Sequence, residues 1–150
     1  MRFCADLHLC PQFVSHSHIK EMVCRATELG YMAIGIPLSQ KALQKESEEY
    51  RALCSSIGVD YVSRIDLSPR TAGELLISLR NLRRKIEVIA VKCYSKDVAR
   101  QAAKDRRVDL ISFPFSHPKK RFFDFAEAEL ASEASTSLEI DLAPLLSEHG

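Results

Sequence analysis

Several features that would assign this chain to a function class at once are missing from its sequence. There is no tryptophan, and the five glycines form neither a phosphate-binding loop nor a G-x-S-x-G nucleophile motif. No apolar run approaches the roughly 18 residues needed to span a bilayer. Asp6 stands where a signal peptide keeps its apolar stretch. We therefore expect a protein that is kept inside the cell and away from membranes.

Cysteine is present but follows no ligand or disulfide pattern. The chain holds five, an odd number, with no C-x-x-C pair and no zinc-finger spacing. This usage is typical of free thiols in a reducing compartment, most of them buried. The five are Cys4, Cys10, Cys24, Cys54 and Cys93.

The length and composition fit one globular domain. The chain has 150 residues, of which 46% are hydrophobic and 27% charged, and a chain of this size can bury a core. No low-complexity linker interrupts it, so we expect a single domain over residues 1–150.

A strong charge asymmetry underlies the net charge of +1. Residues 80–121 contain thirteen Lys or Arg and only four acids, whereas residues 122–150 contain seven acids and no Lys or Arg. Such a basic block is the electrostatic footprint of a protein that binds a polyanion, above all RNA. The alternative is that these cations form solvated helix faces.

Two periodicities alternate along the chain. Apolar runs predict strands near residues 3–9, 31–36, 59–67, 86–91, 108–113 and 138–142. Apolar residues at helical spacing predict helices between them, with a capping box at residues 71–74 and C-terminal caps at Gly30 and Gly58. Strict alternation predicts parallel strands joined by right-handed crossovers.

The faces of the strands favour a barrel over an open doubly wound sheet. On the third strand Arg64 and Asp66 share one face, while Ile65 lies on the other. Later strands also carry polar residues near their C-terminal ends, at Lys92, Glu139 and Asp141. A barrel mouth is built in this way. We therefore predict an α/β fold, a TIM-like (β/α) barrel with about six strand-helix units where eight are usual.

One local motif could hold a metal ion. Asp6, His8 and Cys10 alternate along the first predicted strand, so their side chains are expected on one side of it. All three are competent metal ligands, and His16 and His18 follow nearby. The alternative is that His8 is a hydrogen-bonded residue of the barrel mouth and that the other two histidines lie exposed in a loop.

Two cations argue against that metal site. No histidine lies between His18 and His117, and Arg64 and Lys92 take the inward positions of the central strands. These cations would repel a divalent ion and would pair with the carboxylates of Asp6, Asp66, Glu139 and Asp141. We therefore expect a degenerate site in which Asp6, His8 and Cys10 bind no metal, and we expect no cofactor.

Seven segments in a fixed order carry a resemblance to a known family. They are residues 3–7 (FCADL), 28–31 (ELGY), 63–67 (SRIDL), 97–100 (DVAR), 106–113 (RRVDLISF), 126–131 (AEAELA) and 138–140 (LEI). Each segment alone is weakly specific, but the ordered series spans nearly the whole chain. The chain resembles ribonuclease P protein component 3.

The resemblance implies a TIM-like barrel related to the polymerase and histidinol phosphatase superfamily. Members of that superfamily bind metals through a D-x-H-x-H start on the first strand, in which Asp6 and His8 match and Cys10 replaces the second histidine. Members of the component 3 family are generally longer than this chain, so the last strand-helix units are expected to be missing.

The resemblance also implies partners. It implies a non-catalytic subunit that works with a catalytic RNA, a small ferredoxin-like subunit of the Pop-five type and other ribonuclease P proteins. Together these cleave the 5′ leader from precursor tRNA. The implied compartment is the cytoplasm, or the nucleus and nucleolus in a eukaryote. The rival hypothesis is a metal-dependent phosphoesterase that uses Asp6, His8, Cys10, His16 and His18.

The RNA-binding candidates fall on two rims of the predicted barrel. One group precedes the fourth and fifth strands, so its members should be neighbours on the N-terminal rim: Arg83, Arg84, Lys85, Arg106 and Arg107. The other follows the fifth strand on the C-terminal rim: Lys119, Lys120 and Arg121. We expect the second group to matter more, because TIM-like folds carry function at the C-terminal rim.

Overall fold

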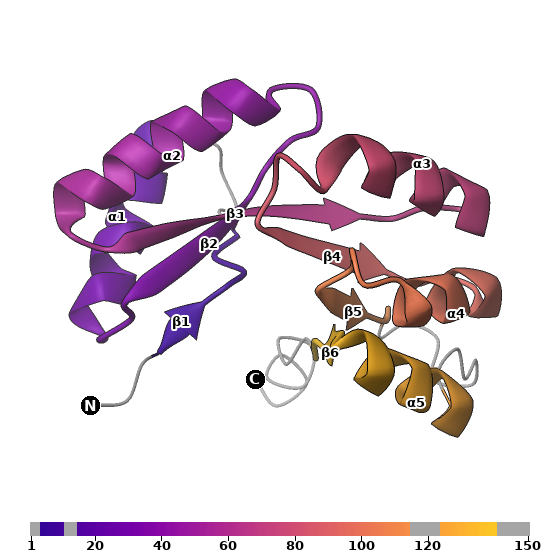
Figure 1. The fold of residues 1–150 in the computed structure, drawn as a ribbon. Coiled ribbons are helices and arrows are strands. Elements are labelled where there is room, and N and C mark those ends of the chain that lie inside the picture. The colour runs from indigo at the N-terminus through magenta and orange to yellow at the C-terminus, as the bar shows by residue number, and fades with distance from the viewer. Residues whose placement is uncertain (1–3, 11–14, 115–123, 141–150) are drawn as a thin grey trace. The chain divides into compact units, whose positions relative to one another are not determined.

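Strands and helices alternate throughout the computed structural model, which describes residues 4–10, 15–114 and 124–140 (Figure 1). The chain divides into two compact units, residues 1–65 and 66–150. The first contains β1 (Ala5–Asp6), α1 (His16–Glu28), β2 (Ala33–Pro37), α2 (Leu43–Ile57) and most of β3 (Asp60–Leu67). The second contains α3 (Ala72–Leu82), β4 (Val88–Lys92), α4 (Lys96–Lys104), β5 (Leu110–Ser112), α5 (Phe125–Ala134) and β6 (Ser137–Leu138).

The strands pair in parallel, as their alternation with helices predicts. In the first unit Ala33 of β2 lies opposite Ala5 of β1 and Asp60 of β3. In the second, Leu110 of β5 lies opposite Ala90 of β4 and Ser137 of β6. The strands follow chain order in the sheet, whereas a doubly wound sheet reverses its order at a switch point. This order confirms the α/β class and the winding of an incomplete TIM-like barrel. The single domain remains a prediction.

Helix ends match the sequence signals closely. The hydroxyls of Ser15, Thr71 and Ser95 cap α1, α3 and α4 by accepting the amide three residues on, at 3.2–3.3 Å. The box predicted at residues 71–74 is only half formed, because the Glu74 carboxylate accepts from the amide of Arg70 (2.8 Å). Gly58, at φ 88°, ends α2.

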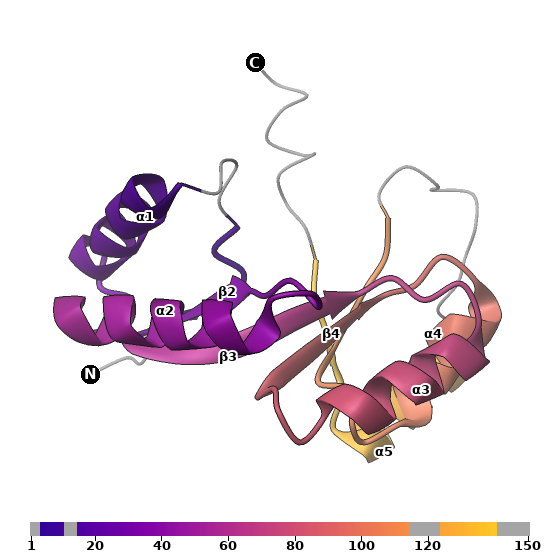
Figure 2. The ribbon, with the colours of Figure 1, turned by 90° about the horizontal axis from the view of Figure 1, so that it is seen from above.

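Each unit has its own buried side chains beneath its helices. Helices α1 and α2 pack together in the first unit (Figure 2), and α3, α4 and α5 pack in chain order in the second (Figure 1). The burial predicted for one face of β3 is confirmed, since Tyr61, Ser63, Ile65 and Leu67 are all buried. On the opposite face Asp66 and Ser68 are exposed, but Arg64 is buried. In the second unit the core is formed by Leu75, Leu79, Ile89, Val91, Val98, Ala102 and Ile111.

Two predictions about burial are wrong. On the last predicted strand the apolar face opposite Glu139 and Asp141 is expected to pack under helices, but Leu138 and Ile140 on that face are 50% and 67% exposed. Only Cys54 and Cys93 among the cysteines are buried, although all five are free thiols. Burial raises the pKa of the Cys93 thiol to about 12, which leaves it protonated and a poor nucleophile at neutral pH. Of the helices in the described ranges, none combines the length and apolarity of a membrane span.

One glycine is required by a close backbone approach. A Cβ atom at Gly35, in the middle of β2, would lie 2.7 Å from the carbonyl oxygen of Leu7. This oxygen belongs to the main chain and cannot turn away as a flexible side chain can. Glycine therefore lets the chain after β1 lie directly against β2.

We predict that Gly35→Ala lowers the free energy of unfolding by about 1–3 kcal/mol, as overpacking in a well-packed core does. Denaturant unfolding of the full chain measures this. Gly73→Ala is the matched control, because a Cβ atom there, near the start of α3, would have Thr71 Oγ1 as its nearest neighbour at 3.9 Å. The control should match the parent or gain up to about 1 kcal/mol of helix propensity. Equal stability of the two variants would contradict the steric argument.

Candidate functional site

The first candidate site, at Asp6, His8 and Cys10, does not have the geometry that the sequence predicts. β1 ends at Asp6, and a bend follows at Leu7, so the three residues do not alternate along one strand. The Asp6 carboxylate accepts a hydrogen bond from the amide of His8 (2.9 Å), and His8 and Cys10 are exposed. In the described ranges no group of three His, Cys, Asp or Glu side chains could hold a metal ion.

Arg64 occupies the inward face of β3 and reaches the backbone that follows β1. It is only 1% exposed, and its Nη1 donates to the carbonyl oxygen of Leu7 (2.8 Å). The sequence correctly predicts a buried cation here. One of its contacts is with this main-chain carbonyl, the same oxygen that lies close to Gly35. Arg64 thus fixes the chain at the bend where β1 ends.

The other predicted members of the barrel-mouth cluster lie at strand ends with varied exposure. Lys92 at the end of β4 is exposed and forms no ion pair with any residue that the structure describes, so its predicted burial is wrong. Asp66 is exposed and Glu139 half-buried. Asp141 lies outside the described residues. The cluster as a whole therefore remains a prediction.

An open groove of about 730 Å³ runs along α1 in the first unit. Asp6 and His18, two residues of the phosphoesterase hypothesis, both line it, together with Cys24 and Glu28. His8 and Cys10 do not line the groove, so it assembles only part of that predicted ligand set.

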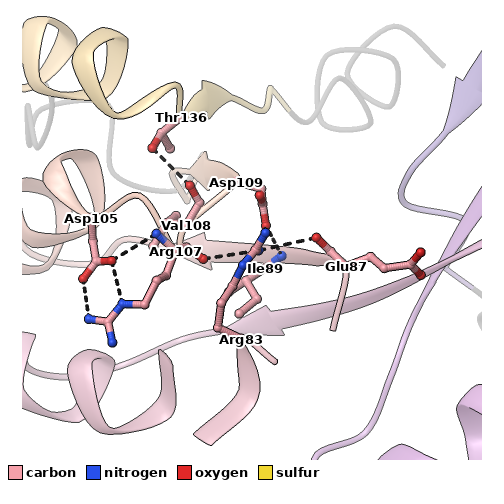
Figure 3. Close-up of polar contacts among 8 residues, drawn as sticks. All are labelled: Arg83, Glu87, Ile89, Asp105, Arg107, Val108, Asp109 and Thr136. Carbon is pink, nitrogen blue, oxygen red and sulfur yellow. Dashed lines mark hydrogen bonds and ion pairs between the residues drawn. The ribbon is translucent and has the colours of Figure 1, made fainter. Parts of the chain in front are cut away.

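The turns before β4 and β5 bring the predicted N-terminal basic group together. Arg83 Nη1 lies 3.4 Å from the carbonyl oxygen of Arg107, which places the two turns side by side (Figure 3). The predicted neighbourhood of these two clusters is therefore confirmed. Lys119, Lys120 and Arg121, the C-terminal group, lie outside the described residues.

Arg83 joins the two turns through an ion pair. Its guanidinium binds the carboxylate of Asp109, and the same carboxylate accepts from the amide of Ile89 (2.8 Å) (Figure 3). Arg83 Nη1 also lies 3.4 Å from the carbonyl oxygen of Glu87. Both charged side chains are about one-third exposed, at 33% and 32%.

A second ion pair forms within the turn before β5. Arg107 binds Asp105 with two nitrogens, Nε at 2.9 Å and Nη2 at 2.7 Å, and the Arg107 amide donates to the same carboxylate at 3.1 Å. These hydrogen bonds hold the pKa of Asp105 below its usual value and raise that of Arg107. Sequence reasoning missed both acids as partners, although Asp105 and Asp109 are interleaved with the arginines.

The ion pairs separate the basic group into two kinds of residue. Arg83 and Arg107 are each bound to a carboxylate. Arg84, Lys85 and Arg106 are exposed and make no ion pair within the described part of the chain. Within the N-terminal basic group, these three cations are therefore the ones that no described carboxylate neutralises.

We predict that Arg64→Met lowers the free energy of unfolding by about 1–3 kcal/mol, because the Leu7 carbonyl loses its buried donor. Chemical denaturation is the measurement. Arg70→Met removes an exposed arginine and should stay within about 0.5 kcal/mol of the parent. A parent-like Arg64→Met protein would show that the bend after β1 does not depend on this contact.

We predict that Asp105→Asn lowers stability by about 1 kcal/mol at pH 7, a value discounted for the partial exposure of Arg107. The folded pKa of Asp105 is depressed, so its stabilisation is complete above the usual carboxyl value of about 4 and is lost as the pH falls through the lowered pKa. The difference between parent and variant should therefore shrink below about pH 4 in melts across pH. A difference that stays constant with pH would contradict the ion pair.

Comparison with known proteins agrees with the component 3 resemblance. A family model described as RNase P subunit p30 matches residues 4–150. A chain in the cryo-EM structure of archaeal ribonuclease P with mature tRNA is similar, with a TM-score of 0.79 and 20% sequence identity. That match covers 97% of this chain but 61% of the other, so this chain spans about three-fifths of the relative's length. No curated protein sequence matches significantly. Because the family model covers almost every residue, the chain belongs to the RNase P subunit p30 family.

Proposed function

We propose that this chain is a protein subunit of ribonuclease P, the ribonucleoprotein that cleaves the 5′ leader from precursor tRNA. The observation that carries the proposal is the match of the subunit family over residues 4–150. The similar chain from archaeal ribonuclease P supports it through the shared fold.

The chain acts by binding and activating the RNA, and the catalytic RNA performs the cleavage. The exposed cations of the second unit, Arg84, Lys85 and Arg106, suit an RNA partner. The loop cations Lys119, Lys120 and Arg121 remain candidates for the same role.

The partners follow from membership in the complex. They are the catalytic RNA, the ferredoxin-like Pop-five-type subunit, the other ribonuclease P proteins and, in the assembled enzyme, precursor tRNA. The compartment proposed with this role is the cytoplasm, or the nucleus and nucleolus in a eukaryotic cell.

We predict that the purified chain alone cleaves no precursor tRNA, and that adding it to the catalytic RNA and the ferredoxin-like subunit increases cleavage. A gel assay of 5′-leader release measures this, with the RNA and the ferredoxin-like subunit without this chain as the control. Equal cleavage with and without the chain would contradict the proposal.

Metal analysis of the same preparation tests the rival phosphoesterase. We expect less than one equivalent of tightly held zinc or manganese, and no phosphatase activity that depends on His8. One or more equivalents of metal, together with turnover that is lost in His8→Ala, would favour the rival.

A further inference from the structure

The two basic turns of the second unit form one connected surface. They are residues 83–87 before β4 and residues 105–109 before β5, and together they contain five Lys or Arg. Arg83 connects them, because its Nη1 reaches the carbonyl oxygen of Arg107 and its guanidinium binds the carboxylate of Asp109 (Figure 3). Arg83 therefore holds the two turns, and the cations on them, next to each other.

Hydrogen bonds and ion pairs within the two turns restrict how their backbone can move. Asp109 also accepts from the amide of Ile89 at 2.8 Å, and Arg107 is held by Asp105 through two nitrogens. Arg84 and Lys85 follow Arg83 directly, and Arg106 precedes Arg107. Each exposed cation therefore lies within two residues of an arginine that is bound to a carboxylate, which restricts the backbone from which its side chain extends.

The surface offers charge without exposed apolar groups. The apolar residues of the two turns include Ile86 and Val108, which are 4% and 1% exposed. Protein interfaces usually bury apolar and aromatic side chains at their centre. The turns contain no aromatic residue on which a base could stack. The exposed cations of the two turns suit phosphate groups, which need only positive charge and hydrogen-bond donors.

The positive surface ends at α5. The next turn along the sheet contains Ser135 and Thr136, and the Thr136 hydroxyl donates to the carbonyl oxygen of Val108 (3.1 Å) (Figure 3). Helix α5 then presents Glu129 and Glu133, both exposed. The exposed cations at the ends of α3 and α4 therefore attract a polyanion, and the exposed acids of α5 repel it.

We propose that Arg84, Lys85 and Arg106 form a binding surface for the sugar-phosphate backbone of RNA, which contacts phosphates and reads no base. The inference rests on the proposed function, since it names the part of the chain that holds RNA. From the sequence alone, the five cations of the N-terminal basic group are equivalent. In the structure two of them, Arg83 and Arg107, are bound to carboxylates, so we assign RNA binding to the other three.

The test compares two triple variants of the full chain that lose the same charge. Arg84→Gln, Lys85→Gln and Arg106→Gln together remove the proposed surface. Lys20→Gln, Lys41→Gln and Arg70→Gln together remove three exposed cations that lie outside the two turns and form no ion pair among the described residues. Affinity is measured between 50 and 300 mM salt for ribonuclease P RNA of the source organism and for an RNA duplex of unrelated sequence.

Each phosphate contact contributes roughly 0.7–0.9 to the slope of log affinity against log salt. The first triple variant should therefore have a slope that is smaller in magnitude by about 2–3, and the change should be similar for both RNAs. The control variant should keep the parent's slope. The first variant should also keep the parent's Tm, because it removes no ion pair that the described structure contains.

The outcomes separate this inference from the proposed function. A parent protein that neither binds RNA nor increases cleavage overturns the proposed function itself. If the parent protein binds RNA but the first triple variant has the same salt slope as the parent, the proposed binding surface is wrong and the proposed function is unaffected. If the salt slope falls equally in both triple variants, the proposed surface is also wrong, because net charge alone then explains RNA binding. Loss of ferredoxin-like subunit binding with RNA binding intact would assign the surface to a protein partner instead.

Discussion

Parallel strand pairing is the constraint on which the rest of this structure depends. A parallel strand cannot follow its neighbour through a tight turn, so each crossover needs a helix, and every strand begins on the same rim. The turns before β4 and β5 therefore meet even though 22 residues separate the starts of these strands, Val88 and Leu110. Arg83 and Asp109 can form an ion pair only because of that arrangement. The charge pattern of the surface follows from the strand order.

Local sequence patterns predicted the features that depend on local physics. The caps at Thr71 and Gly58 follow from hydrogen bonding and backbone conformation within one turn. The two faces of β3 follow from the geometry of a strand. The length of β1 could not be predicted in this way, because the strand ends where Arg64 contacts the Leu7 carbonyl, 57 residues away along the chain. Such an end is set by tertiary contact.

In the candidate site, too, some features could be predicted from the local sequence and others depend on tertiary contacts. Counting charges located the basic turns correctly, but it treated every cation as equivalent. Only the folded structure reveals that Asp105 and Asp109 engage two of them, since ion pairing depends on distances that a charge count lacks. Likewise, the inward positions of Arg64 and Lys92 were predicted from strand parity. Their exposures differ greatly, because parity gives the side of a strand and says nothing about what covers it.

The contacts of Arg83 have a consequence for how the second unit opens. One guanidinium accounts for contacts to both turns, and Asp109 connects it to the amide of Ile89. Separating the start of β4 from the start of β5 therefore breaks several hydrogen bonds together. Local opening of this kind is cooperative, and segments joined in this way exchange their amide hydrogens as one group. We therefore expect the α3–β4 and α4–β5 segments to open as one unit, and the amide of Ile89, which donates to Asp109, to exchange with that unit.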